Sequence, residues 1–474
     1  MRQLLNPFSV FLVASLMGLI TPMVAEDRAS GEHVLTLPAT TQADGRSASA
    51  IPSEQPTDSE GVLPRCDGWS FHLQSTMVRQ QHWRFHSPYA GPNSLADQND
   101  TEHTWTVTGF IGRRLWSGSE VYVNPEMSQG IGFGNTTGIA GFPNGEATRA
   151  AASNPHYYFA RYFLRQTIGL GGSSDAVTDD KNQIAGSVYR NRLVITIGKI
   201  AASDIFDANS YTHDPRTQFL NWALFDTGAW DYPADARGYT QGAVLEWITP
   251  RWAVRVGSFM EPKEANGLEL DDNIARAHGD TAEVELDYEL FGHGGKTRIM
   301  GYHNRAHMGS YRETLADSAL NFDITQTRRY SSKQGLALNL EQELGDWAGA
   351  FLRLGWNDGS NETWAFTEID QSAAVGCSFK GKPWKRPNDV LGIAGLLNGL
   401  SSDHRDFLAA GGVGFIVGDG QLHYGPEKIL EAYYSAQLCR AFTTSIDYQL
   451  VGNPAYNRDR GPVSIVALRG HLDL

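Results

Sequence analysis

From about residue 68 to the end of the chain, hydrophobic and polar residues alternate with a period of two, and short turns interrupt the alternation. Leu336, Leu338 and Leu340 share one side of a stretch that turns at Gly345 and Asp346. Similar alternation runs through residues 121–124, 241–248, 252–256, 281–290, 350–356 and 443–451. A spacing of two puts neighbouring side chains on opposite faces of a strand and cannot make a helical stripe. The pattern therefore predicts an all-β protein.

Two all-β architectures fit this pattern, a soluble sandwich or propeller and a transmembrane antiparallel β-barrel. The barrel is favoured because tight turns alternate with long polar stretches, such as 130–154 and 360–389, and because Trp247, Trp252 and Trp347 stand at strand ends. We expect short periplasmic turns and longer extracellular loops. At about 25 residues per strand with its connection, residues 66–474 hold about 16 strands.

The N-terminal region predicts export. Arg2, an apolar run over residues 8–20 and a small residue at Ala25 are typical of a signal peptide that spans residues 1–25. Residues 26–65 are polar and aperiodic, which predicts a flexible leader. After the first run, no stretch approaches the roughly 20 apolar residues of a membrane-spanning helix.

The amino-acid composition limits the classes of partner and of metal site that the protein can have. The net charge is −14, from 39 basic and 53 acidic residues, and this balance argues against nucleic acid as a partner. Cys66, Cys377 and Cys439 have no metal-ligand spacing, and two open alternatives are a Cys377–Cys439 disulfide and three unpaired thiols.

Six segments carry a family resemblance, at residues 121–126, 138–145, 404–412, 414–420, 424–434 and 453–463. In sequence and in order they resemble the carbohydrate-selective porins of the OprB type in Gram-negative bacteria. The resemblance implies a 16-stranded outer-membrane barrel, passive diffusion of sugars such as glucose, no catalytic residues and no cofactor. Lipid of the bacterial outer membrane and mono- or small oligosaccharides are the expected partners, and homotrimer and monomer both stay open. The chain departs from the usual aromatic end residue of such barrels, because it ends in Leu474.

A sugar path is predicted from one aromatic and basic segment and the strand before it. The candidate pore-lining residues are Glu120, Asn124, Glu126, Tyr157, Phe159, Arg161, Phe163 and Arg165. The last five share one face of an extended strand, where rings pack on the C–H faces of a pyranose and guanidinium groups donate to its hydroxyls. In one alternative, Phe159 and Phe163 face lipid and the arginines pair with lumen carboxylates. In another, residues 149–163 form a loop helix.

Other chemistry is less favoured. His303 and His307 are four residues apart but lie in a strand-like setting, so lumen or loop histidines are preferred to a metal site. The acidic residues 283, 285, 287 and 289 alternate strictly, which suits a hydrated lumen wall better than a glycosidase carboxylate pair. An exported β-structured enzyme that acts on polysaccharide, such as a glycosidase or lyase, remains the alternative to a porin.

Overall fold

The computed structural model describes residues 67–474. The predicted signal peptide (1–25), the predicted leader (26–65) and Cys66 lie outside the described residues. Within 67–474, no helix combines the length and the apolar character that crossing a membrane requires.

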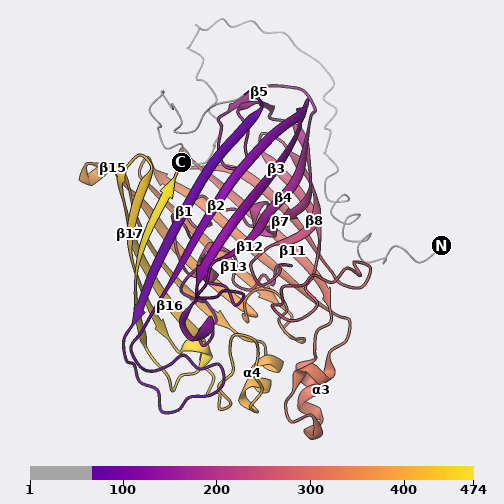
Figure 1. Cartoon of the computed structure of the whole chain (residues 1–474), viewed down its shortest axis with the longest axis vertical. Helices are drawn as coiled ribbons and strands as arrows, with labels where there is room; N and C mark the ends of the chain where they lie inside the picture. The colour runs from indigo at the N-terminus through magenta and orange to yellow at the C-terminus, as the bar shows by residue number, and fades with distance from the viewer. Residues whose placement is uncertain (1–66) are drawn as a thin grey trace, which may run out of the picture. The chain divides into compact units, whose positions relative to one another are not determined.

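Sixteen antiparallel strands close into a barrel (Figure 1). In chain order they are β1 (Trp69–His82), β2 (Asp100–Trp116), β3 (Ser119–Gly130), β4 (His156–Gly169), β7 (Arg192–Ile200), β8 (Thr240–Ile248), β9 (Trp252–Met260), β10 (His278–Leu290), β11 (His293–Ala306), β12 (Ser331–Gly345), β13 (Ala348–Asn357), β14 (Gln371–Gly381), β15 (Arg386–Gly399), β16 (Glu427–Cys439), β17 (Phe442–Gly452) and β18 (Val463–Asp473). The predicted fold class and strand number are confirmed.

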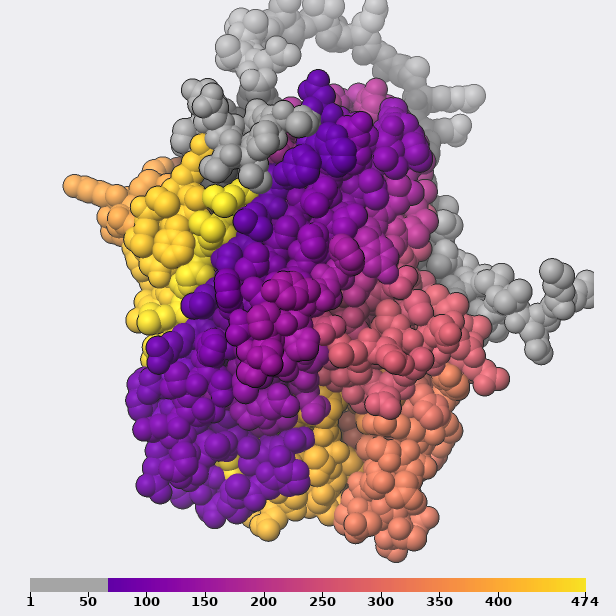
Figure 2. Space-filling model, in the orientation of Figure 1, coloured from indigo at the N-terminus to yellow at the C-terminus, as the bar shows by residue number. Residues whose placement is uncertain are grey.

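The barrel closes where β1 pairs with β18, in a register that runs from Gln74 opposite Asp473 to His82 opposite Ile465. Leu73 and Leu474 continue this seam, because each donates its backbone N–H to the carbonyl of the other at 2.9–3.0 Å. Closure pairs the edge of every barrel strand, so no row of backbone N–H and C=O groups is left open. In the space-filling view, β1 to β4 form a continuous outer wall (Figure 2).

The two ends of the barrel differ. Connections of two to four residues join β2 to β3, β8 to β9, β10 to β11, β12 to β13, β14 to β15 and β16 to β17. Trp116, Trp247 and Trp347 lie exposed at this end, as expected for an aromatic girdle at a membrane interface. We name it the periplasmic end. The connections at the other, extracellular end are longer and carry the helices α2 (Trp222–Phe225), α3 (Tyr311–Ala316) and α4 (Ser402–Ala409), together with short 3-10 turns.

One periplasmic connection is long. Residues 170–191, between β4 and β7, carry the separate two-stranded hairpin of β5 (Ser174–Val177) and β6 (Gly186–Tyr189). We call this connection the periplasmic loop. The prediction of short turns is correct for the other connections at this end and wrong for this one. The alternation pattern gave no sign of a long connection here.

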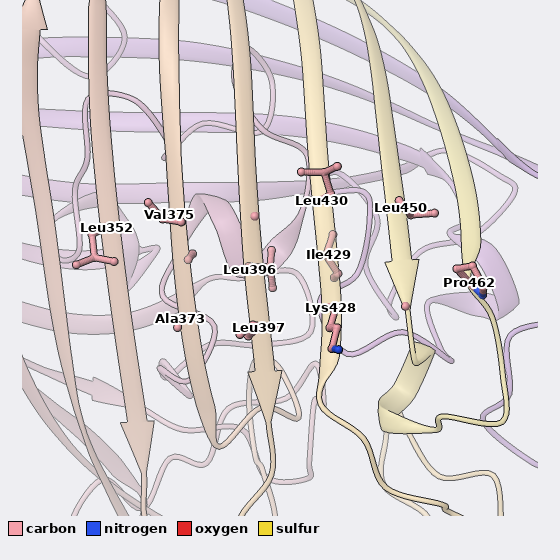
Figure 3. Close-up of a pocket in the computed structure, with 13 residues that line it drawn as sticks. Leu352, Ala373, Val375, Leu396, Leu397, Lys428, Ile429, Leu430, Leu450 and Pro462 are labelled. Carbon is pink, nitrogen blue, oxygen red and sulfur yellow. The ribbon is translucent and has the colours of Figure 1, made fainter.

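Side chains alternate between the lumen and the outer surface, as β18 illustrates. Arg469 and His471 are buried on the lumen side, whereas Leu468 is 57% exposed on the outer side. The charged residues of the closing strand therefore share the lumen side. The lipid-facing side carries an apolar groove between β13 and β17, where Ala373 and Gly395 leave room among leucines (Figure 3).

Two smaller expectations are corrected. The segment 149–163 is no helix, because β4 begins at His156 and pairs with β3 and β7. Cys377 and Cys439 are free thiols, so the disulfide between them does not form.

Candidate functional site

Two extracellular connections fold into the barrel and are bonded to its wall. We call residues 131–155 the first inward loop and residues 201–239 the second inward loop. Glu431 on β16 accepts hydrogen bonds from the backbone N–H of Leu220 at 2.6 Å and of Asn221 at 3.1 Å. Glu427 lies four residues before Glu431 on the same strand. It accepts hydrogen bonds from two backbone amides of the first inward loop, at 2.8 and 3.0 Å. Both carboxyl groups are fully buried, and their oxygens accept hydrogen bonds from the loop backbone.

Wall arginines hold the carbonyl groups of the second inward loop. Arg353 on β13 donates to the carbonyl of Asp207 at 2.7 Å and to that of Thr212 at 2.8 Å. Arg469 on β18 donates to the carbonyls of Pro215 at 2.6 Å and Gln218 at 2.7 Å. Buried carboxyl groups and arginines of the wall therefore fix, by hydrogen bonds, the loops that narrow the lumen.

A polar cluster centres on Glu126 of β3. Its carboxylate accepts hydrogen bonds from the hydroxyls of Thr108 at 2.5 Å, Tyr158 at 2.7 Å and Tyr239 at 3.1 Å. Arg216 of the second inward loop adds an ion pair at 3.2 Å. Burial by itself lowers the pKa of Arg216, but the carboxylates of Glu146 and Glu126 outweigh it and raise this pKa, so the guanidinium stays charged.

Arginine side chains cover the aromatic rings of this Glu126 cluster. The guanidinium of Arg161 lies 5.1 Å from the ring centre of Tyr239, and that of Arg237 lies 4.5 Å from the ring centre of Tyr158. Arg161 is also held by a bidentate pair with Asp204, at 2.5 and 2.7 Å. Tyr158, Arg161 and Asp204 keep part of their surface exposed, so the cluster presents ring faces and hydrogen-bonding groups inside the barrel.

The predicted single face on β4 is wrong for its first two members. Tyr157 is 80% exposed and Phe159 is 56% exposed, both on the outer side. The reason is a β-bulge: Asn124 pairs with Arg161 and Pro125 pairs with Phe159, which leaves Ala160 as an extra residue. The extra residue reverses the parity, so that Tyr158 points inward in place of its two neighbours.

The other predicted path residues lie on the lumen side. Glu120 accepts from Arg114 at 3.0 Å and from the Tyr122 hydroxyl at 2.6 Å. Phe163 stacks on Tyr122 with ring centres 5.1 Å apart. Together with Asn124, Glu126, Arg161 and Arg165 they line the wall formed by β3 and β4, but they do not form one continuous row.

The periplasmic loop reaches this same wall from the other end. Arg165 donates to the carbonyl of Asn182 at 2.8 Å, and the side-chain amide of Asn124 donates to the Asn182 side chain at 2.9 Å. Lys181 pairs with Asp473 at 2.5 Å, which ties the loop to the closing strand. Residues 181 and 182 therefore lie against the lumen wall, close to the predicted path.

A second charged cluster lies on β8 to β12. Arg255 contacts Glu246 at 3.1 Å, Glu283 at 2.9 Å and Glu285 at 3.2 Å. Arg298 contacts Glu285 at 2.7 Å. Glu283 and Glu285 of β10 therefore lie on the lumen wall, as the strict alternation predicted. Their pairing with arginines is a finding of the structure.

Tyr158, Tyr239, Asp204 and Arg216 belong to the Glu126 cluster and were not among the predicted residues. Tyr158 is adjacent to two predicted residues, but only the bulge turns it inward. Tyr239 lies two residues before the alternating stretch 241–248, and this position next to a strand start was the available sequence signal. Asp204 and Arg216 lie in the second inward loop, where no periodicity marks them.

Comparison with known families decides the class of the barrel. The model of the carbohydrate-selective porin, OprB family, matches residues 94–474. The chain belongs to the OprB family. This membership and the closed barrel identify an outer-membrane porin, a channel rather than the polysaccharide-acting enzyme that was the alternative.

Solved structures of similar fold include the high-pH structure of Pseudomonas putida OprB, with 15% identity, a TM-score of 0.64, and coverage of 86% of this chain and 94% of that chain. The outer membrane channel DcaP of Acinetobacter baumannii follows with 10% identity, a TM-score of 0.48, and coverage of 86% and 97%. At 15% identity the likeness to the Pseudomonas putida structure concerns the fold alone. The comparison with curated protein sequences gave no match.

Proposed function

We propose that this OprB-family porin admits small sugars such as glucose by passive diffusion, and that the Glu126 cluster makes the passage carbohydrate-selective. The observation that carries the proposal is the combination of tyrosine rings, guanidinium groups and carboxylates around Glu126. A pyranose offers apolar C–H faces and a hydroxyl rim, and these groups complement both.

The chemistry of the cluster suits transit rather than tight capture. The side-chain donors of Arg161, Tyr158 and Tyr239 already have protein partners, as in the pairs of Arg161 with Asp204 and of Tyr158 with Glu126. A sugar hydroxyl exchanges with these partners and does not meet an unsatisfied group, so the gain per contact is small. Weak contacts permit both entry and exit, which conduction requires.

Proteoliposome swelling tests the proposal. Rates for glucose, a disaccharide and a trisaccharide are compared with those of uncharged non-sugar solutes of matched size, with wild-type protein and the variants Tyr158→Ala and Arg161→Ala. We expect the wild type to favour sugars over matched solutes, and both variants to lose this preference.

Tyr157→Ala is the matched control, because Tyr157 is the adjacent tyrosine on the outer face and should leave the preference unchanged. Wild-type rates that depend on solute size alone would contradict the proposed selectivity. A preserved preference in Tyr158→Ala and Arg161→Ala would exclude the Glu126 cluster from it.

A further inference from the structure

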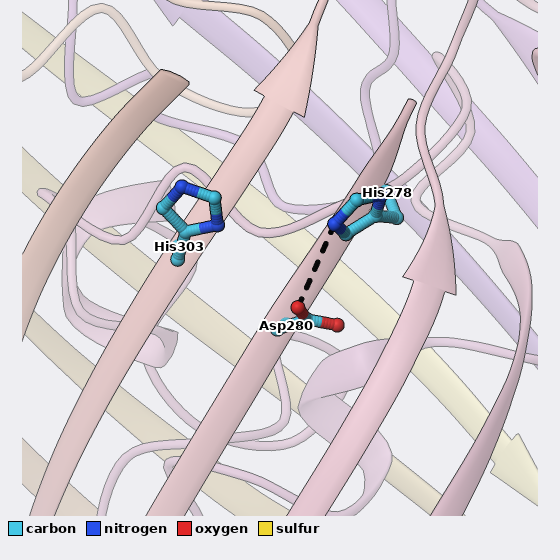
Figure 4. Close-up of side chains that lie close together, drawn as sticks. All are labelled: His278, Asp280 and His303. Carbon is cyan, nitrogen blue, oxygen red and sulfur yellow. Dashed lines mark ion pairs between the residues drawn. The ribbon is translucent and has the colours of Figure 1, made fainter. Parts of the chain in front are cut away.

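Three side chains with metal-ligand chemistry meet on the outer face of the barrel, at the extracellular end of β10 and β11. His278 and Asp280 are two residues apart on β10, and His303 lies directly opposite Asp280 on β11 (Figure 4). All three point away from the lumen, because the intervening residues Gly279 and Thr281 are buried on the lumen side. One ligand atom from each side chain lies within 4.8 Å of the others.

The geometry of His278 selects one tautomer. Its Nδ1 lies 2.9 Å from the backbone carbonyl of Ile274, which can only accept a hydrogen bond. Nδ1 therefore carries the proton, and the lone pair of Nε2 is free. A carbonyl that holds the remote nitrogen of a histidine in this way is the usual outer support of a metal ligand.

The spacing of the ligand atoms fits an ion between them. His278 Nε2 lies 3.7 Å from Asp280 Oδ2, which is longer than a hydrogen bond. Two ligands about 2.0–2.1 Å from a tetrahedral zinc ion lie about 3.4 Å apart. A small shift of either side chain therefore gives metal-binding distances, with no change of backbone.

We propose that His278, Asp280 and His303 bind one divalent transition-metal ion of the zinc type, with a fourth position open to solvent. Two imidazoles and a carboxylate favour zinc, cobalt or nickel over magnesium or calcium, which prefer oxygen ligands alone. The ion would join the beginning of β10 to the end of β11 and so fasten the extracellular rim next to the connection 261–277. The site lies outside the lumen and is separate from the sugar path.

The neighbouring guanidinium of Arg305 provides a further test of where the metal binds. Arg305 lies opposite His278 on the same outer face. Its positive charge opposes a cation at the site, so Arg305→Gln should tighten metal binding, whereas a site elsewhere on the protein would not respond.

Cobalt titration of untagged, detergent-purified protein, treated first with chelator, tests the site. We expect one Co²⁺ per chain with visible absorption bands, and zinc competition that removes them. His303→Ala and Asp280→Asn should weaken binding by about tenfold or more. His307→Ala is the control, because His307 lies four residues further along and packs against Tyr330.

Heat-modifiable gel migration shows whether each variant forms the barrel. We expect every variant to form it, because the substituted residues are partly exposed on the outer surface. No cobalt binding by the folded wild type at 100 micromolar cobalt (a concentration on the order of ten times a modest dissociation constant) would overturn the proposal. Equal binding by wild type and folded His303→Ala would overturn it as well.

Discussion

Arg165 of the barrel wall donates a hydrogen bond to the backbone carbonyl of Asn182, 2.8 Å away in the periplasmic loop. The guanidinium also lies 5.2–5.3 Å from the ring centres of Phe163 and Tyr122. Its stacked position and its bond together hold the loop against the wall. Arg165 is therefore placed to support the periplasmic loop, whereas Arg161 belongs to the Glu126 cluster.

The two arginines should thus respond differently to truncation. Arg165→Ala removes a support of the periplasmic loop, and we expect larger or noisier single-channel conductance with sugar preference retained. Arg161→Ala should reduce sugar preference instead. Single-channel recording and liposome swelling on both variants distinguish these outcomes, and identical changes in both would contradict the division of roles.

The parity of β18 predicts a contrast between neighbours. Leu468→Arg places a charge on the lipid-facing side, at a cost of about 2–4 kcal/mol near the bilayer centre, so assembly should fail or fall strongly. Arg469→Leu should still assemble, but it frees the carbonyls of Pro215 and Gln218 and should alter conductance. Outer-membrane yield and heat-modifiable migration measure assembly, and equal assembly of the two variants would refute this assignment of faces.

Two aspartates of the second inward loop should differ in how their replacement by asparagine changes stability. Asp207 accepts from the Thr227 amide at 2.6 Å and from Asn339 at 2.7 Å, and it pairs with buried Arg353 at 3.4 Å. Asp207→Asn leaves that guanidinium without its compensating charge and should cost about 3–5 kcal/mol of unfolding free energy. Burial, and then the nearby Asp207 carboxylate, raise the pKa of Asp226 well above its ordinary value. Asp226→Asn resembles the protonated form, so it should match wild type at acidic pH and be more stable than wild type at neutral pH.

The same raised pKa sets the sign of a pH effect. The folded barrel retains the Asp226 proton at pH values where the unfolded chain has released it, so this group lowers stability as pH rises above the ordinary carboxyl range. Urea unfolding at several pH values should show a shallower decline with pH in Asp226→Asn than in wild type. Parallel curves for the two proteins would show that Asp226 does not titrate as inferred.

The bulge on β4 can be tested by removing it. Deleting Ala160 should restore strict alternation and turn position 159 toward the lumen. In a background with the three native cysteines replaced by serine, Phe159→Cys should react faster with a membrane-impermeant thiol reagent after the deletion than before it. If the deletion does not change the reaction rate, the bulge does not control the parity of this segment.

Alternation was sufficient to predict the fold because each barrel strand has one apolar and one polar environment. It also predicted that the alternating acidic residues, which include Glu283, lie on the lumen wall. It failed on β4, because one inserted residue such as Ala160 reverses every face before it without changing composition. It also missed Tyr239 and Arg216, because the inward course of a loop depends on contacts such as those of Glu431 with residues far along the chain.

The seam between β1 and β18 has a consequence for the order of assembly. Most neighbouring strands of the ring are consecutive in sequence and can pair as hairpins, whereas the seam joins strands at opposite ends of the barrel sequence. Closing so long a loop carries the largest entropic cost of any strand pairing here, so the seam is expected to form last and to open first. Inside a bilayer an open seam exposes two rows of unsatisfied backbone groups, which makes half-closed forms costly. The barrel should therefore enter and leave the membrane-inserted state as a unit, with β1 and β18 as the place where a folding catalyst would act.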